Sequence, residues 1–108
     1  MSDDRAVRAV TFLRREAGGV TTLCVVGELD ISTLDALSGA LDGAVQTSVT
    51  EMVVDLGDCP FLCSRSMGLI EASAFELQAR GARLVVRNQP RAFDLISSAI
   101  GTYVFEAV

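Results

Sequence analysis

Short apolar segments alternate with single helix-length segments along most of this chain, and this alternation restricts the folds open to it. Residues 20–29 (VTTLCVVGEL), 51–56 (EMVVDL) and 82–88 (ARLVVRN) have the length and the β-branched or aliphatic content of buried strands. The near-continuous hydrophobicity of residues 51–56 favours a strand that is covered on both faces or nearly so. Because strands joined by single helices form right-handed crossovers, the sequence predicts an α/β fold with a largely parallel sheet.

Two further strands are predicted at the ends of the chain. Residues 8–16 (RAVTFLRRE) precede the AGG segment at 17–19, and glycine reaches positive φ at little cost in such a turn. This first strand therefore forms an antiparallel hairpin with the segment at 20–29, and the sheet is mixed. Residues 102–108 (TYVFEAV) predict a closing strand. The expected order is β-β-α-β-α-β-α-β, with helices packed on a mixed β-sheet.

Three amphipathic segments supply the helices. The first spans residues 33–45, with Ser32 as its expected N-cap and Asp35 completing a shortened capping box. The second spans residues 65–79, and the third has Pro90 in its first turn. The inward-facing residues are Leu34, Leu37, Leu41 and Val45 in the first helix, Met67, Ile70, Ala74 and Leu77 in the second, and Phe93, Ile96 and Ile100 in the third.

Length and charge narrow the class of protein. A chain of 108 residues suits one domain, here residues 1–108, with one hydrophobic core. The net charge of -5 and the pI near 4.5 argue against a nucleic-acid partner, which usually meets a basic face. No apolar run approaches the roughly 18 to 20 residues of a membrane span, and residues 1–10 lack a secretory core. We expect a cytoplasmic protein without a membrane span.

Missing residue types exclude several kinds of chemistry. The chain has no histidine, and all nine of its basic residues are arginine. Serine and cysteine hydrolase triads, lysine Schiff bases and a phosphate-loop lysine are therefore excluded. The chain has three cysteines, Cys24, Cys59 and Cys63. An odd number without the spacing of a disulfide framework indicates free thiols in a reducing compartment. We expect no metal, no cofactor and no enzymatic activity.

Two motifs resemble those of the STAS domain, the family named after sulphate transporters and anti-sigma factor antagonists. Residues 25–41 contain Gly27-Glu28-Leu29-Asp30, which reproduces the G-E-L-D loop that many members carry between a strand and the first helix. Residues 53–70 are similar to the family's next strand, its F-x-D-S-S-G-L-G-like turn and its second helix. The resemblance extends over residues 8–108 and implies a STAS-like fold.

The resemblance also implies a phosphorylation site. In phosphorylatable antagonists the first serine of the D-S-S-G turn accepts phosphate from an anti-sigma factor that is a serine kinase and binds the ATP. That register falls on Ser64, with Cys63 in place of the aspartate, Arg65 in place of the second serine and Ser66 in place of the first glycine. From its position before a helix, Ser64 is also the expected N-cap, a role that is compatible with phosphorylation because a helix N-terminus accommodates anions.

The contact surface that the resemblance implies comprises Glu28, Asp30, Cys63, Arg65, Ser66 and Met67. Several roles stay open at this stage. Asp30 either caps the helix that follows or contacts the partner, and Arg65 is either solvated or pairs with a phosphate or with Asp30. Ser66 is either a residue of the first helical turn or a second phosphate acceptor. Cys63 is either a small packed side chain or a redox-sensitive thiol at a helix N-terminus.

Two functions follow from the resemblance. The first is an anti-sigma factor antagonist that binds a kinase-type anti-sigma factor and is switched off by serine phosphorylation. The alternative, motivated by the altered residues around Ser64, is a STAS interaction module without phosphotransfer, in a signalling assembly or a transporter complex. The chain ends where family members often carry a further helix, and an apolar patch left there favours a homodimer.

Overall fold

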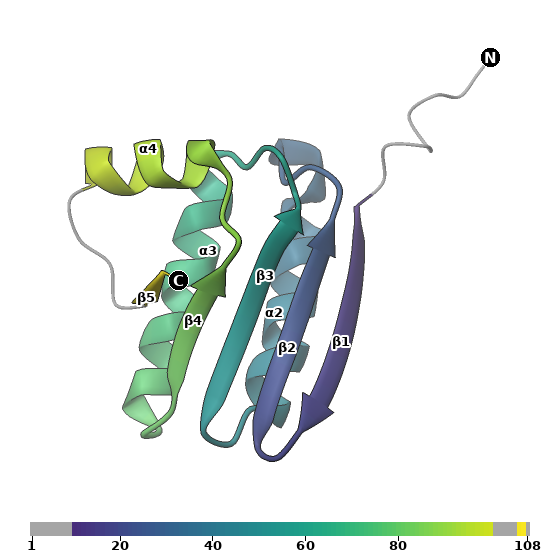
Figure 1. Cartoon of the computed structure of the whole chain (residues 1–108), viewed down its shortest axis with the longest axis vertical. Helices are drawn as coiled ribbons and strands as arrows, with labels where there is room; N and C mark the ends of the chain where they lie inside the picture. Colours follow the sequence, from purple (N-terminus) through teal and green to yellow (C-terminus); the bar gives the residue numbers. More distant parts are fainter. Residues whose placement is uncertain (1–9, 101–105, 108) are drawn as a thin grey trace.

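The computed structural model describes residues 10–100 and 106–107, which form a mixed sheet with helices packed on it (Figure 1). The α/β class and the element order predicted from the sequence are confirmed. The sheet has five strands in sequential order, with the first pair antiparallel and the other pairs parallel. The strands are β1 (Thr11–Ala17), β2 (Val20–Val26), β3 (Glu51–Asp58), β4 (Arg83–Arg87) and β5 (Glu106–Ala107).

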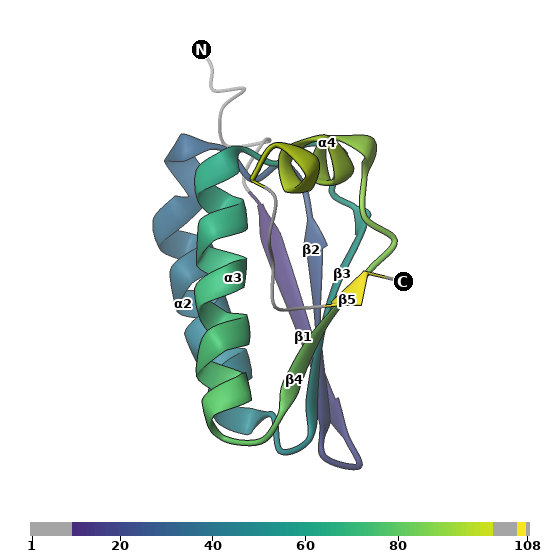
Figure 2. The same ribbon diagram turned by 90° about the vertical axis from the view of Figure 1, so that its left-hand side faces the viewer.

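The two longest helices lie side by side on one face of the sheet (Figure 2). They are α2 (Leu34–Thr47) and α3 (Ser64–Ala79), and a 3₁₀ turn, η1 (Ile31–Thr33), precedes α2. A shorter helix, α4 (Arg91–Ile100), lies across the end of the sheet at which β2, β3 and β4 finish. Because α2 follows β2 and α3 follows β3 after short connections, the N-termini of both helices also lie at this carboxyl end.

Alternate residues of the strands build the core against α2 and α3. The strand contribution comprises Leu23 and Val25 of β2, Met52, Val54 and Leu56 of β3, and Leu84 and Val86 of β4, all at most 1% exposed. Val53 and Val85 point to the opposite face, where they are register partners and are 1% and 5% exposed. The expectation that 51–56 is buried on both faces is therefore met, although α2 and α3 cover only one of them.

The hairpin turn between β1 and β2 is the predicted one. Gly18 and Gly19 adopt φ of 59° and 83°, in the left-handed region that glycine enters without a Cβ clash. Pairing between Ala17 and Val20 then closes the hairpin directly after these two residues.

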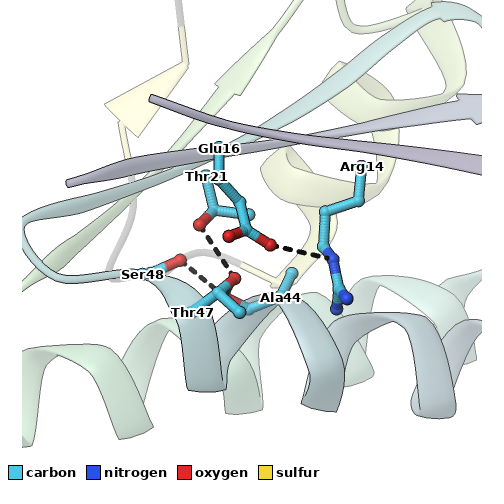
Figure 3. A network of polar contacts seen from close by, with 6 residues as sticks. All are labelled: Arg14, Glu16, Thr21, Ala44, Thr47 and Ser48. Carbon is cyan, nitrogen blue, oxygen red and sulfur yellow. Dashed lines mark hydrogen bonds and ion pairs between the residues drawn. The ribbon is translucent and has the colours of Figure 1, made fainter. Parts of the chain in front are cut away.

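Side chains satisfy the carbonyl groups at the C-terminus of α2 (Figure 3). The Ser48 hydroxyl donates to the Ala44 carbonyl at 2.7 Å, and the Thr47 hydroxyl donates to the same oxygen at 3.1 Å. Thr21, fully buried in β2, shares a hydrogen bond of 2.9 Å with the Thr47 hydroxyl. The end of the helix is thereby tied to the sheet.

The C-terminus of α3 is closed by a Schellman motif. Gly81, predicted as the glycine that ends this helix, has φ of 81°. Its amide donates to the Gln78 carbonyl at 3.1 Å, and the next amide, of Ala82, donates to the Leu77 carbonyl at 2.9 Å. Arg80 reaches across to the Val45 carbonyl of α2 at 2.5 Å, so the ends of the two helices are also joined to each other.

The predicted N-cap of the first helix was wrong, although α2 begins only one residue after its predicted start. Ser32 is not its N-cap; the capping box forms earlier, at η1, between Asp30 and Thr33. Thr33 is the N-cap of α2 and makes no side-chain cap bond there, because its hydroxyl is used by η1. Of the predicted closing strand 102–108, only residues 106–107 fall within the described part of the chain, as a strand parallel to β4.

Candidate functional site

The two motifs singled out in the sequence are joined by backbone hydrogen bonds at the carboxyl end of the sheet. Beyond the β2–β3 ladder, the Gly27 amide donates to the Asp58 carbonyl at 3.0 Å and the Leu29 amide donates to the Phe61 carbonyl at 3.0 Å. The Cys63 amide in turn donates to the Leu29 carbonyl at 2.8 Å. The loops after β2 and β3 therefore lie side by side, at the carboxyl ends of parallel strands, where ligands usually bind in α/β proteins.

Asp30 stabilises the first of these loops through local hydrogen bonds. Its carboxylate accepts from the Ser32 amide at 3.0 Å and from the Ser32 hydroxyl at 2.6 Å, while its own amide donates to the Thr33 hydroxyl at 3.0 Å. These bonds, with that of the Ser32 hydroxyl first, lower the pKa of Asp30 below its ordinary value of 3.8. Of the two roles left open by the sequence, the structure shows capping.

Ser64 is the first residue of α3 and not its N-cap, so the predicted capping role was wrong. Cys63 is the N-cap, in an extended conformation, and its carbonyl accepts the first helical amides, those of Ser66 at 3.1 Å and Met67 at 3.3 Å. Ser64 is exposed, and its hydroxyl makes no hydrogen bond within the described part of the chain. The hydroxyl is thus accessible to solvent and does not stabilise the fold through a hydrogen bond to any of those residues.

Ser66, two residues along, has the opposite environment. Its side chain is 0% exposed, and its hydroxyl donates to the Cys63 carbonyl at 2.5 Å. Met67 beside it is 3% exposed and belongs to the core cluster. Both residues lie under the surface, where they support the first turn of α3, and we leave them out of the proposed contact surface.

Two large apolar side chains flank this first turn, and sequence reasoning gave neither of them a role. Ile31 in η1 is 62% exposed, and Phe61 in the loop before α3 is 46% exposed. Phe61 directly precedes the fully buried Leu62, and Ile31 follows the fully buried Leu29 by two residues; a bridge between the two leucines joins the loops. For Phe61 the signal in the sequence is alternation, because the neighbour of an inward-facing leucine in extended backbone points outward. Ile31 lies in the 3₁₀ turn η1, where strand alternation does not apply.

Charged groups surround the same surface. Glu28, Asp58 and Arg65 are all exposed, on the first loop, at the end of β3 and in the first turn of α3 respectively. The surface therefore combines exposed apolar side chains with charges of both signs around an accessible hydroxyl. This composition is typical of a protein-binding surface.

The nearby cysteines differ in burial. Cys59 is 1% exposed and its thiol donates to the Phe61 carbonyl at 3.3 Å; burial raises the pKa of Cys59 above its ordinary value of 9.0. Cys63 is half-buried. Within the described residues, no three cysteines, aspartates or glutamates converge as a metal site would require, and no helix is long and apolar enough to span a bilayer.

Comparisons with known proteins agree with this architecture. The model of the family described as "Mlab, STAS domain" matches residues 12–101. An anti-sigma factor antagonist from Mycobacterium paratuberculosis superposes with a TM-score of 0.76 at 26% identity, over 87% of this chain and 80% of that one. A search of curated protein sequences found no match.

Two structures of the anti-sigma factor antagonist SpoIIAA share the fold. The unphosphorylated form has a TM-score of 0.73 at 17% identity, over 91% of this chain and 88% of that one. The phosphorylated form, described as a Bacillus cell fate determinant, has a TM-score of 0.68 at 20% identity, over 91% of both chains.

Proposed function

The chain belongs to the MlaB-type STAS domain family, and from this premise we propose that it is an anti-sigma factor antagonist switched by phosphorylation of Ser64. In its unmodified form it binds a kinase-type anti-sigma factor. The observation that carries the proposal is the accessible hydroxyl of Ser64 at the first turn of α3, which makes no hydrogen bond to the residues that the structure describes. Ile31 and Phe61 are exposed on the two loops that precede α2 and α3. The likeness to anti-sigma factor antagonists supports the choice of partner.

The proposed reaction takes place on the partner, which binds the ATP. The Ser64 oxygen attacks the γ-phosphorus, so that an O–P bond forms while the bond between this phosphorus and the β,γ-bridging oxygen breaks. ADP leaves, and the hydroxyl proton passes to a base of the kinase or to solvent. This chain supplies only the acceptor, which agrees with its lack of a catalytic set.

A phosphate on Ser64 would act at the docking surface. It adds a charge of about -1.5 to -2 at an end of the sheet that already carries two exposed carboxylates, those of Glu28 on the loop after β2 and of Asp58 at the end of β3. The N-terminus of α3 accommodates such an anion, because the first helical amides and the dipole favour negative charge there. Burying Ile31 and Phe61 against a partner would then require the phosphate to lose water, so docking fails while the fold persists.

Incubation with a candidate kinase-type anti-sigma factor and ATP tests the proposal, with the phosphate located by peptide mass spectrometry. We expect one phosphate on Ser64, its loss in Ser64→Ala, and its retention in the matched variant Ser66→Ala. Phosphate that persists in Ser64→Ala would overturn the assignment.

A second function is favoured by one feature, Cys63 at the position where phosphorylatable relatives carry aspartate. An interaction module without phosphotransfer would use the same surface, in a signalling assembly or a transporter complex, and would take up no phosphate. The variant Cys63→Asp distinguishes the two functions. Phosphate uptake by the native chain supports the switch, whereas uptake by Cys63→Asp alone supports the module.

A further inference from the structure

A groove runs between α2 and α3 on the side away from the sheet, and its upper end adjoins the surface around Ser64 at Arg65. It contains two hollows, of about 340 Å³ near the helix N-termini and about 160 Å³ further down. Ser38 of α2 and Leu69 of α3 line both hollows, so the two are continuous. Leu34 and Leu41 line the α2 side and Ala72 the α3 side, and with Leu69 they form an apolar strip along the groove between polar and charged residues.

The rim of this groove is acidic. Asp35 lines the upper hollow, Asp42 and Glu76 line the lower one, and all three side chains are exposed. The one cation among the lining residues of the two hollows is Arg65, at the upper end. An apolar floor between carboxylates is complementary to a surface with an apolar stripe and cationic flanks.

We propose that this groove is a docking site for a cationic amphipathic helix of a partner protein. The groove follows two parallel helices, a shape that accepts a third helix by its apolar stripe. Asp35 and Asp42 are seven residues apart on one helix, about 10.5 Å at a rise of 1.5 Å per residue. Two arginines or lysines seven residues apart on the incoming helix have the same spacing and meet both carboxylates.

The charge of the rim also decides against other occupants. An anionic membrane surface or an acidic peptide would be repelled by Asp35, Asp42 and Glu76. A second copy of this chain is disfavoured because the whole protein carries a net charge of -5. The proposal does not require phosphotransfer at Ser64 and stands or falls independently of it.

The test uses a synthetic 18-residue peptide designed as an amphipathic helix, with leucines on one face and arginines seven residues apart on its flanks. Backbone amide shifts of the full chain locate the binding site, and a titration gives the dissociation constant. Two further peptides serve as controls, one with glutamate in place of arginine and one with the same composition in scrambled order. We expect shifts along the facing sides of α2 and α3 for the first peptide alone.

Two pairs of variants separate groove binding from general attraction to an acidic protein. The triple variant Asp35→Asn, Asp42→Asn, Glu76→Gln removes the rim charges, and Glu16→Gln, Asp58→Asn, Asp94→Asn removes three charges elsewhere. Each exposed ion pair contributes little by itself, but the losses of three add up, so we expect about tenfold weaker binding for the first triple and a smaller loss for the second.

Steric variants give an independent readout. Ser38→Phe fills both hollows and should weaken binding at least as much as the rim triple, while Ala36→Phe, on the exposed side of the same helix, should not. Circular dichroism establishes that each variant is folded. Equal losses for the two triples, or shifts confined to the loops around Ser64, would overturn the proposal. Groove shifts that grow with protein concentration without peptide would overturn it in favour of a second copy.

Discussion

The two ends of α3 are built in opposite ways. At its C-terminus, Gly81 closes a Schellman motif and Arg80 ties the helix to a carbonyl of α2. At its N-terminus, Cys63 provides no side-chain cap, and the first helical residue, Ser64, is exposed. One end of the helix is completed by local hydrogen bonds, and the other leaves helix amides and a hydroxyl available to a partner.

The same contrast holds for the two ends of the sheet. Around the hairpin end, Thr21, Thr47 and Ser48 satisfy buried polar groups (Figure 3). At the carboxyl end, Ile31 and Phe61 leave large apolar side chains exposed on the two loops that precede α2 and α3. Proteins depart from locally optimal choices mainly at functional sites, and we therefore place the proposed binding surface at this end.

The largest expected effect is on the closed end of α3. Leu77 is fully buried there, and Leu77→Ala should lower the free energy of unfolding by about 2 to 5 kcal/mol through lost burial and a cavity. Urea denaturation measures this. Phe75→Ala, at an exposed residue of the same helix, is the matched control and should change stability by less than about 0.5 kcal/mol. Similar losses for both would contradict the packing described for this end.

Two glycines of this region should respond to alanine in opposite directions. Gly81 has φ of 81°, so Gly81→Ala forces a side chain into the left-handed region and should cost about 1 to 2 kcal/mol. Gly68 lies in the helix with ordinary φ and no atom near an added Cβ, so Gly68→Ala should gain about 0.5 to 1 kcal/mol. Thermal unfolding of both variants measures these changes in stability. A loss of stability in Gly68→Ala would show that the N-terminal end of α3 is more tightly constrained than its exposure indicates.

A smaller loss is expected where α2 is tied to the sheet. Thr21→Val keeps the shape of a fully buried side chain but removes its hydrogen bond to Thr47, at a cost of about 1 kcal/mol. Thr22→Val, on the opposite face of β2, is the control for the change in composition. An unchanged free energy of unfolding in Thr21→Val would remove this bond from the account of the closed end.

The smallest effect concerns the pH dependence at the open end. The pKa of Asp30 is lower in the folded chain than its ordinary value of 3.8, so the unfolded chain takes up the proton first. The stabilising contribution of Asp30 is therefore full above 3.8 and is lost as pH falls through the lowered value. In urea unfolding, the free energy of unfolding of Asp30→Asn should decrease less steeply as pH falls through that range. The same pH dependence in both proteins would contradict the capping geometry.

The sequence was sufficient for the element order, because strand and helix periodicities were clear, but not for the helix N-termini. Two serines, Ser32 and Ser64, have high N-cap propensity, and neither is used as an N-cap. The Cys63 amide is bonded to the Leu29 carbonyl, which holds Cys63 extended and makes Ser64 the first residue able to become helical. Contacts between distant loops thus override local propensity.

Accessibility within the candidate site was equally beyond local reasoning. Ser64 and Ser66 are the same residue type two positions apart, yet only a helix with a known buried face assigns one to solvent and the other to the interior. Likewise, the apolar character of Phe61 predicts burial, and its exposure follows from the inward placement of Leu62. The groove between α2 and α3 depends on how two helices pack and has no signature in either helix alone.

The most direct test of the central claim measures affinity for a kinase-type anti-sigma factor by isothermal titration calorimetry. It compares the unmodified chain with the chain that is quantitatively phosphorylated on Ser64. Like-charge contact and desolvation cost several kcal/mol, so the account predicts binding about a hundredfold weaker or more after phosphorylation, with an unchanged circular dichroism spectrum. Equal affinity of the two forms would contradict the claim that the open end of α3 is a phosphorylation switch.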